Sequence, residues 1–320
     1  MPMTKWFAAA LIVVAASTGA YGQAYPTKPV NVVTAAPPGG PSDVMARFIA
    51  EELTTALGQR FLVENRPGAN GALAGDIVAK ADPSGYTIML SSSSMFTITP
   101  HVNAGLRWSP LKDFTPIVLI GTTPLAIGVP KDSPYNSLKD LLDAAKKAPG
   151  KINFAAQTGS MPHIAGKLLD STAGIDITHI PFRGGAQMHA AALAGDVNVI
   201  IDGITPLIPH FQSGALKPIA VTGDTRVEVL PNTPAVAEVV PGFEAASWFS
   251  LFGPANLDPA VVKTISAAIA KMLERPDAKA KLIQMAVLPP SGDANAARKR
   301  LQTDYDKFGD VIKRANIKVE

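Results

Sequence analysis

The sequence contains no cysteine, and this absence removes several kinds of chemistry. Disulfides, thiol nucleophiles and thiolate metal sites are excluded, and so is the acylated cysteine of a lipoprotein anchor. A secreted chain without disulfides must rely on hydrophobic cores, which its 47% hydrophobic content can supply. At 320 residues the chain is long for a single core, so we expect two domains.

The sequence also lacks clustered positive charge. Its 29 basic and 26 acidic side chains give a formal charge of +3 and are spread along the whole chain. A phosphate backbone requires Lys and Arg gathered on one face, so we do not expect a nucleic-acid partner.

Catalytic and cofactor motifs are missing as well. The glycines are not spaced as G-x-G-x-x-G, there is no P-loop, and the five histidines show no metal-ligand spacing. Ser160, His163 and Asp202 could be aligned as a catalytic triad, but no G-x-S-x-G elbow surrounds the serine. We therefore expect no enzyme activity, no cofactor and no metal.

The N-terminus has the order of a secretory signal peptide. Lys5 precedes an apolar run from Trp6 to Ala16, and small residues follow as far as Gly22. We expect residues 1–22 to be removed by cleavage after Gly22, with Ala24 as the alternative. The apolar run is shorter than the roughly 20 residues that a membrane-spanning helix needs, so a soluble secreted protein is expected.

The stretch AAPPGGPSDVMARFIAEEL, Ala35 to Leu53, joins an apolar strand to an amphipathic helix through Pro and Gly. Ser42 or Asp43 stands where a helix N-cap is expected. The first turn of a helix has free amide N–H groups and a partial positive charge, which together favour a small anion. Since no Lys or Arg lies between Val30 and Ala46, backbone amides and hydroxyls would hold that anion.

Strands alternate with helices along the rest of the chain, which predicts an α/β fold with mainly parallel sheets. Ligands of such sheets lie beyond the carboxyl ends of the strands, where Pro38–Ser42 and Ser91–Ser94 are placed. Two apolar segments, Phe114–Val129 and Phe249–Phe252, are expected to pass between domains. The predicted first domain is therefore 23–123 with 247–320, and the second is 124–246.

Three loops share one design, in which a strand ends, a short Gly, Ser or Thr segment follows and a helix begins. They are Pro38–Asp43, Thr158–His163 and Arg183–Gln187. Their division between two domains predicts an anion-binding cleft where helix N-termini face one another.

Several side chains in these loops have two interpretations. Ser42 and Asp43 are either helix caps or ligand contacts. His163 either donates to the ligand as a neutral ring or is an interior histidine bonded to backbone. Arg183 either binds the ligand or makes a surface ion pair.

An ordered set of motifs resembles the periplasmic substrate-binding receptors of tripartite tricarboxylate transporters, also called Bug receptors. The resemblance runs from about Tyr25 to the C-terminus. It is carried by YPTKPV, PPGGPSDVMAR, VENRPGANG, ADPSGYT, DFTPI, APGKINF, HIAGKLL, HIPFRGG, LKPIAVT, LPNTPAVAEV and SWFSLFGPA. Each motif is weak alone, but the ordered set is specific.

The resemblance implies a type II periplasmic-binding-protein fold, whose two α/β domains close on a small carboxylate (an organic acid or amino acid) without catalysis. It also implies delivery to membrane transporter subunits by a monomer. The ligand-binding positions that it assigns are Pro38, Gly39, Gly40, Ser42, Asp43, Ser92, Ser93, Thr158, Gly159, Ser160, His163, Phe182, Arg183, Gly184, Gly185 and Asp202. A secreted sensor of the same fold, acting on a membrane signalling partner, is the alternative.

The sequence departs from the family pattern in three places. Ala35-Ala36 stands where members often carry Pro-Phe, the loop before His163 is about one residue shorter, and Gln187 replaces a common proline. Loss of the aromatic residue is expected to widen the pocket on that side.

Overall fold

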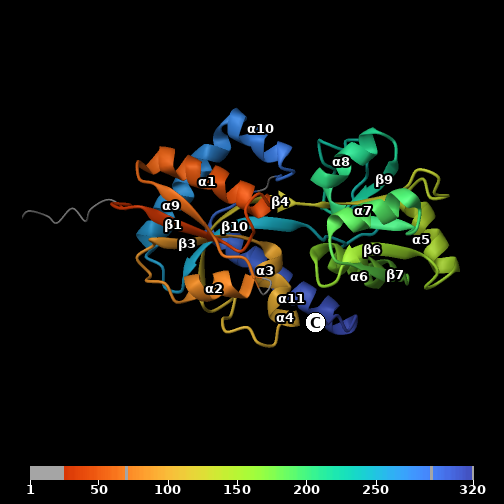
Figure 1. Cartoon of the computed structure of the whole chain (residues 1–320), viewed down its shortest axis with the longest axis horizontal. Coiled ribbons are helices and arrows are strands. Elements are labelled where there is room, and N and C mark those ends of the chain that lie inside the picture. The colour runs from red at the N-terminus through yellow and green to blue at the C-terminus, as the bar shows by residue number, and fades with distance from the viewer. Residues whose placement is uncertain (1–24, 69–70, 289–290, 319–320) are drawn as a thin grey trace, which may run out of the picture.

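The computed structural model describes residues 25–68, 71–288 and 291–318, and the expected signal peptide lies outside these ranges. The chain forms two α/β domains side by side (Figure 1). This architecture confirms the expected fold class. None of the helices in the described ranges has the length and apolar character needed to cross a bilayer.

The first domain is built on a five-stranded sheet. Its strand order is β2 (Phe61–Asn65), β1 (Val30–Thr34), β3 (Thr87–Ser92), β10 (Ser247–Pro254) and β4 (Phe114–Thr123). β1 is parallel to β2 and β3, whereas β10 is antiparallel to β3 and β4. The sheet is therefore mixed rather than mainly parallel, because β10 enters it from the second domain.

Alternate residues of β3, the central strand of this sheet, face different helices. Ile88 and Leu90 pack with Met45 and Ile265, whereas Met89 packs on the other face with Phe96. The helices on the first face are α1 (Pro41–Leu57), α9 (Pro259–Glu274) and α10 (Pro276–Gln284). Those on the second face are α2 (Ala72–Ala79), α3 (Ser93–Thr97) and the start of α11 (Ala294–Arg314), and the short α4 (Thr99–Val102) follows α3.

The second domain repeats this plan. Its sheet has the order β7 (Thr178–Phe182), β6 (Asn153–Gln157), β8 (Val199–Gly203), β5 (Leu125–Pro130) and β9 (Leu216–Val221). β6 is parallel to β7 and β8, and β5 is antiparallel to β8 and β9. This sheet is also mixed, because β5 and β9 lie next to the connections to the first domain.

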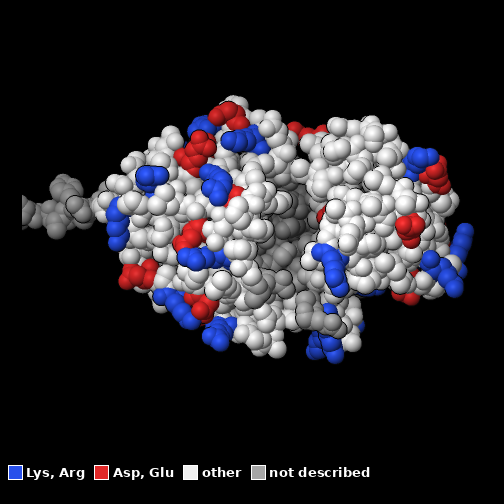
Figure 2. Space-filling view, in the orientation of Figure 1, with Lys and Arg blue, Asp and Glu red and all other residues white. Residues whose placement is uncertain are grey.

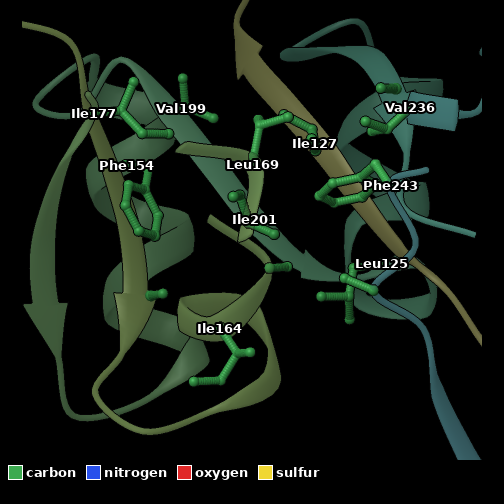
Figure 3. Close-up of a cluster of buried hydrophobic side chains, with 14 of the residues drawn as sticks. Leu125, Ile127, Phe154, Ile164, Leu169, Ile177, Val199, Ile201, Val236 and Phe243 are labelled. Carbon is green, nitrogen blue, oxygen red and sulfur yellow. The ribbon is translucent and has the colours of Figure 1, made fainter. Parts of the chain in front are cut away.

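Two hydrophobic cores cover the two faces of the second sheet. Phe154, Ile164 and Ile201 belong to one core (Figure 3), which includes α5 (Leu138–Lys147) and α6 (Met161–Ala173). The core on the other face includes α7 (Gly185–Ala194) and α8 (Ile204–Gln212). A 3-10 turn, Val236–Glu238, precedes the return to the first domain.

In the described part of the chain, at least three segments join the domains. The chain passes from β4 to β5 at Pro124 and returns just before β10, so Phe249–Phe252 lies inside a strand and is not the connection that the sequence suggested. The third segment is α11, whose Leu301 belongs to a first-domain core and whose Phe308 belongs to the core of Phe154. One helix therefore packs into both domains.

A buried polar network fixes α11 against the returning strand. Asp304 is fully buried and accepts hydrogen bonds from Trp248 Nε1 at 2.9 Å and Arg300 Nε at 2.6 Å. Lys307 Nζ lies 2.9 Å from Asp304 Oδ1 and donates to the carbonyl oxygen of Glu244 at 3.0 Å. The helix is thereby held at the place where the chain re-enters the first domain.

Candidate functional site

A cleft of about 710 Å³ lies between the domains. Figure 2 shows the hollow between the two lobes. Its walls include the ends of the central strands, β3 in the first domain and β8 in the second. Six of the residues expected at the site line the cleft: Ser42, Ser92, Thr158, Gly159, Ser160 and Asp202.

The loop before α1 is held in shape by Asp43. Its Oδ2 accepts hydrogen bonds from Gly39 N at 2.8 Å and Arg47 Nε at 3.0 Å, and its Oδ1 accepts one from Asn65 Nδ2 at 2.7 Å. The hydrogen bonds from Arg47, Asn65 and Gly39 lower the pKa of Asp43 to about 2. The carboxylate is 2% exposed and is not among the residues lining the cleft, so its partners belong to the protein.

The start of α1 differs from the sequence expectation. The N-cap residue is Gly40 and makes no side-chain cap bond, so neither Ser42 nor Asp43 is the cap. Pro37 and Ser42 line the cleft, whereas Pro38, Gly39 and Gly40 do not. The reason is the turn at Gly39, whose φ of +81° folds the loop back toward Asp43.

The serine segment is not a loop. Ser91 and Ser92 end β3, and α3 begins at Ser93. Ser92 and Ser94 line the cleft, while the buried Ser93 hydroxyl lies 2.8 Å from that of Ser247 on β10. Ser93 therefore joins the start of α3 to the returning strand.

The loop between β6 and α6 forms part of the opposite wall. Ser160 is the N-cap of α6: its Oγ accepts from His163 N at 3.5 Å and donates to the Gln157 carbonyl at 2.6 Å. Gly159 N donates to His163 Nδ1 at 3.2 Å. Thr158, Gly159 and Ser160 line the cleft, so the histidine shapes the wall from behind.

His163 is an uncharged interior side chain. Its ring is buried and stacks on that of His179, with the ring centroids 3.7 Å apart. Burial, together with the nearby His179 and Lys167, lowers the pKa of His163 to about 3. At neutral pH the ring therefore accepts the Gly159 hydrogen bond at Nδ1, and this geometry favours the interior interpretation.

The third predicted loop lies outside the cleft. Phe182, Arg183, Gly184 and Gly185 are not among its lining residues, and Arg183 is exposed. In its place the start of α8 reaches the cleft through Asp202 and Gly203. Asp202 was expected at the site, whereas Gly203, the N-cap of α8, was not.

Other lining residues were not predicted because they lie in strands, in short helices or in turns that resemble ordinary surface turns. Ala35 and Ala36 do line the cleft, as the missing aromatic residue implied, and the glycine-rich turn after β2 also contributes. At Gly71, with φ +90°, an added Cβ would lie 2.9 Å from Met95 Cγ, so only glycine fits there. The missed residues are Thr34, Pro37, Pro67, Gly68, Gly71, Leu90, Met95, Thr99, Val102, Leu125, Gln157, Gly203 and Ser247, whereas Ser91, Ser94, Met161 and Pro162 lie within the expected segments.

The polarity of the cleft comes from hydroxyl groups and helix N-termini. No Lys or Arg occurs among the described residues that line it, and the N-terminal ends of α1, α6 and α8 all reach its walls. Such ends attract anions through free amide N–H groups. Among the residues described, no group of three His, Asp or Glu side chains is arranged to hold a metal ion.

Comparison with known proteins gives consistent matches. A sequence model of the family described as "Tripartite tricarboxylate transporter family receptor" matches residues 45–317. A protein of Pseudomonas sp. (strain P51), encoded in the tcbD-tcbE intergenic region, is 31% identical over 90% of this chain and 87% of its own length.

Two solved structures are similar in both sequence and fold. A protein of R. palustris solved with adipate is 30% identical, with a TM-score of 0.77, over 92% of this chain and 99% of that chain. MatC from Rhodopseudomonas palustris, solved with bound malate, is 28% identical, with a TM-score of 0.72, over 90% of this chain and 100% of that chain.

Proposed function

Since the chain belongs to the tripartite tricarboxylate transporter receptor family, we propose that it captures a small carboxylate in the periplasm and delivers it to the membrane subunits of such a transporter. The observation that carries the proposal is the cleft itself. It is large enough for a small organic acid and lined by hydroxyls and helix N-termini, and its described walls hold no Lys or Arg. Relatives with adipate and malate bound support the ligand class.

The proposed receptor binds and releases its ligand unchanged. Asp43 and His163, two of the groups that could transfer a proton, are engaged in the protein's own loops behind the cleft wall. We place the ligand carboxylate against the starts of α1 and α6, where Ser42 and Thr158 supply hydroxyls. We also propose that the N-terminal segment directs export and that the receptor acts as a monomer.

A thermal-shift screen of small carboxylates tests the binding step. A ligand that binds only the folded protein at about 100 times its dissociation constant adds roughly 2.7 kcal/mol of stability. At about 2–4 °C per kcal/mol, the expected rise in Tm is roughly 5–10 °C. The methyl esters of the same acids are the ligand control and should leave Tm unchanged.

A matched pair of variants locates the site. Thr158→Trp places a large ring in the cleft, whereas Thr55→Trp makes the same change at an exposed position of α1 outside the cleft. We expect the first variant to lose the ligand-dependent rise and the second to keep it. A flat response of the unmodified protein to mono- and dicarboxylates, amino acids and aromatic acids would contradict the proposal.

A further inference from the structure

One ionisable side chain faces the cleft among its described lining residues, and it is an acid. Asp202 stands at the end of β8, the central strand of the second sheet, in register with Ala126 of β5. Its side chain is 20% exposed. A carboxylate in the wall would repel a bound anion, so the binding of an anion does not explain why Asp202 is there.

Asp202 is held in one orientation by the protein. Its Oδ1 accepts a hydrogen bond from Gly203 N at 2.8 Å, and its Oδ2 lies 2.8 Å from Nε2 of His189 on α7. The His189 side chain is 14% exposed, and its ring lies edge-on against that of His210. A Cβ added at Gly185 would lie 3.8 Å from Asp202 Oδ2, so the start of α7 closes around the pair.

The acceptor sites that Asp202 has left determine which ligand group can face it. An ionised carboxylate only accepts hydrogen bonds, and its two oxygens offer about four lone-pair sites. Gly203 and His189 use one site on each oxygen, which leaves acceptor capacity. A ligand carboxylate or ether oxygen placed there would bring acceptor against acceptor, and a carboxylate would also meet a like charge.

We infer that the ligand carries, besides its carboxylate, a hydroxyl or amino group that donates a hydrogen bond to Asp202, and that His189 is the positioning residue that holds Asp202 for this contact. The inference rests on the proposed carboxylate-binding function and narrows its substrate class. The carboxylate of the ligand lies against the starts of α1 and α6, and its donor group points to the end of β8.

Matched sets of ligands that differ in one group test the inference by calorimetric titration. Suitable sets are propionate, lactate and alanine; succinate, malate and aspartate; and 3-phenylpropionate, 3-phenyllactate and phenylalanine, with each enantiomer measured separately. In a set that binds, the hydroxy or amino acid should bind at least about tenfold more tightly than the unsubstituted acid, because hydrogen bonds to charged groups are the stronger kind. The hydroxy and amino arms identify which donor the site prefers.

Variants of the pair assign the effect to named atoms. Asp202→Asn keeps the shape but removes the charge, and should reduce the preference for the amino acid over the unsubstituted acid several-fold. His189→Leu should reduce the same preference while the affinity for the unsubstituted acid stays. His189→Gln supplies an N–H donor again and should restore the preference. The ratio between two ligands is the readout, because a general loosening of the fold would weaken both alike.

The possible results distinguish failure of this inference from failure of the proposed function. If some carboxylate binds but the unsubstituted acid binds as well as its hydroxy and amino partners, the inference is wrong and the receptor proposal stands. An Asp202→Asn variant that keeps the full preference also overturns it. If no carboxylate binds, the proposed function fails, and the inference built on it fails too.

Discussion

The loops that begin α1 and α6 contain the same hydrogen bond made by different side chains. In the first domain Gly39 N donates to Asp43, and in the second Gly159 N donates to His163, each acceptor lying four residues after its glycine. Both glycines have positive φ, +81° and +72°. The two domains therefore share one interaction, in which a side chain in the first turn of the helix accepts a hydrogen bond from the glycine before it.

The difference between the loops lies in how each acceptor is accommodated. Asp43 stays ionised because Arg47 and Asn65 also donate to it. His163 stays neutral because burial and the stacked His179 oppose its charge. The loop geometry therefore requires an acceptor at this position and not a particular charge.

Removal of the Asp43 carboxylate should be the most damaging change. Asp43→Ala leaves the Gly39 N–H and the Asn65 amide without their acceptor, and it removes the partner of Arg47. The expected loss in the free energy of unfolding is roughly 2–4 kcal/mol. Chemical denaturation followed by circular dichroism measures it.

The matched control is an aspartate in an exposed helical ion pair. Asp143 lies 2.5 Å from Lys139 across one turn of α5, and its side chain is about half exposed. Asp143→Ala should cost much less stability than Asp43→Ala, because solvent screens the pair. Equal losses in the two variants would show that Asp43 has no special role in its loop.

Removal of the acceptor in the second loop should cost less. His163→Leu leaves one N–H, that of Gly159, without its acceptor, so roughly 1–2 kcal/mol of stability should be lost. His163→Asn can place a carbonyl oxygen near the position of Nδ1 and should retain more of the stability. If the Leu variant is as stable as the Asn variant, the hydrogen bond from Gly159 is not what selects the histidine.

The two loops should also respond to acid in different pH ranges. The pKa of His163 falls from 6.5 to about 3 on folding, so below pH 6.5 the unfolded chain binds a proton that the folded chain does not. This contribution to stability is present above pH 6.5 and declines as the pH falls toward 3. For Asp43 the same argument places the loss between pH 3.8 and 2.

Measuring the stability of wild type and His163→Asn side by side isolates the contribution of His163 to the pH dependence. Burial raises the pKa of Asp170 to about 6, so this group acts in the opposite sense as the pH falls, but it is present in both proteins and largely cancels in their difference. Wild type should therefore lose stability relative to His163→Asn as the pH falls from 7.5 to 4.5 in urea denaturation. A constant difference over that range would mean that His163 titrates normally in the folded protein.

The sequence allowed much of the fold to be predicted, because periodic apolar residues and turn signals are local. The start of α9, for example, is marked in the sequence by Asp258, which caps the helix, and by Pro259 at its first position. The family resemblance is confirmed as well. The mixed sheets were missed because strand direction depends on where β5 and β10 enter, and no local pattern records that entry.

The site was harder to predict, because a loop motif does not show which way its side chains turn. Asp43 and His163 lie in the expected loops but point back to glycines rather than into the cleft. The loop of Arg183 and the end of β8 look equally suitable in sequence, yet the structure brings Asp202 and not Arg183 to the cleft wall. The pairing of Asp202 with His189 joins two elements and has no sequence motif.

The two glycines of the first loop should differ in their tolerance of alanine, and Gly40→Ala should have the smallest effect on stability. Gly39 has φ +81°, whereas Gly40 has φ −74°, which any residue can adopt. An added Cβ at Gly40 would lie 3.4 Å from the Pro37 carbonyl oxygen, an ordinary contact. Gly39→Ala should therefore cost about 1–2 kcal/mol of stability, because the left-handed region is unfavourable for alanine, while Gly40→Ala should stay within about 0.5 kcal/mol.

Gly159→Ala completes this comparison. Gly159 has φ +72°, so its loss of stability should match that of Gly39→Ala if the two loops are equivalent devices. Both can be measured by urea denaturation at pH 7, where Asp43 is ionised and His163 is neutral. A large loss at Gly39 with none at Gly159 would show that the loop of α6 relaxes where that of α1 cannot. The neutral histidine would then hold its glycine less firmly than the ionised aspartate does.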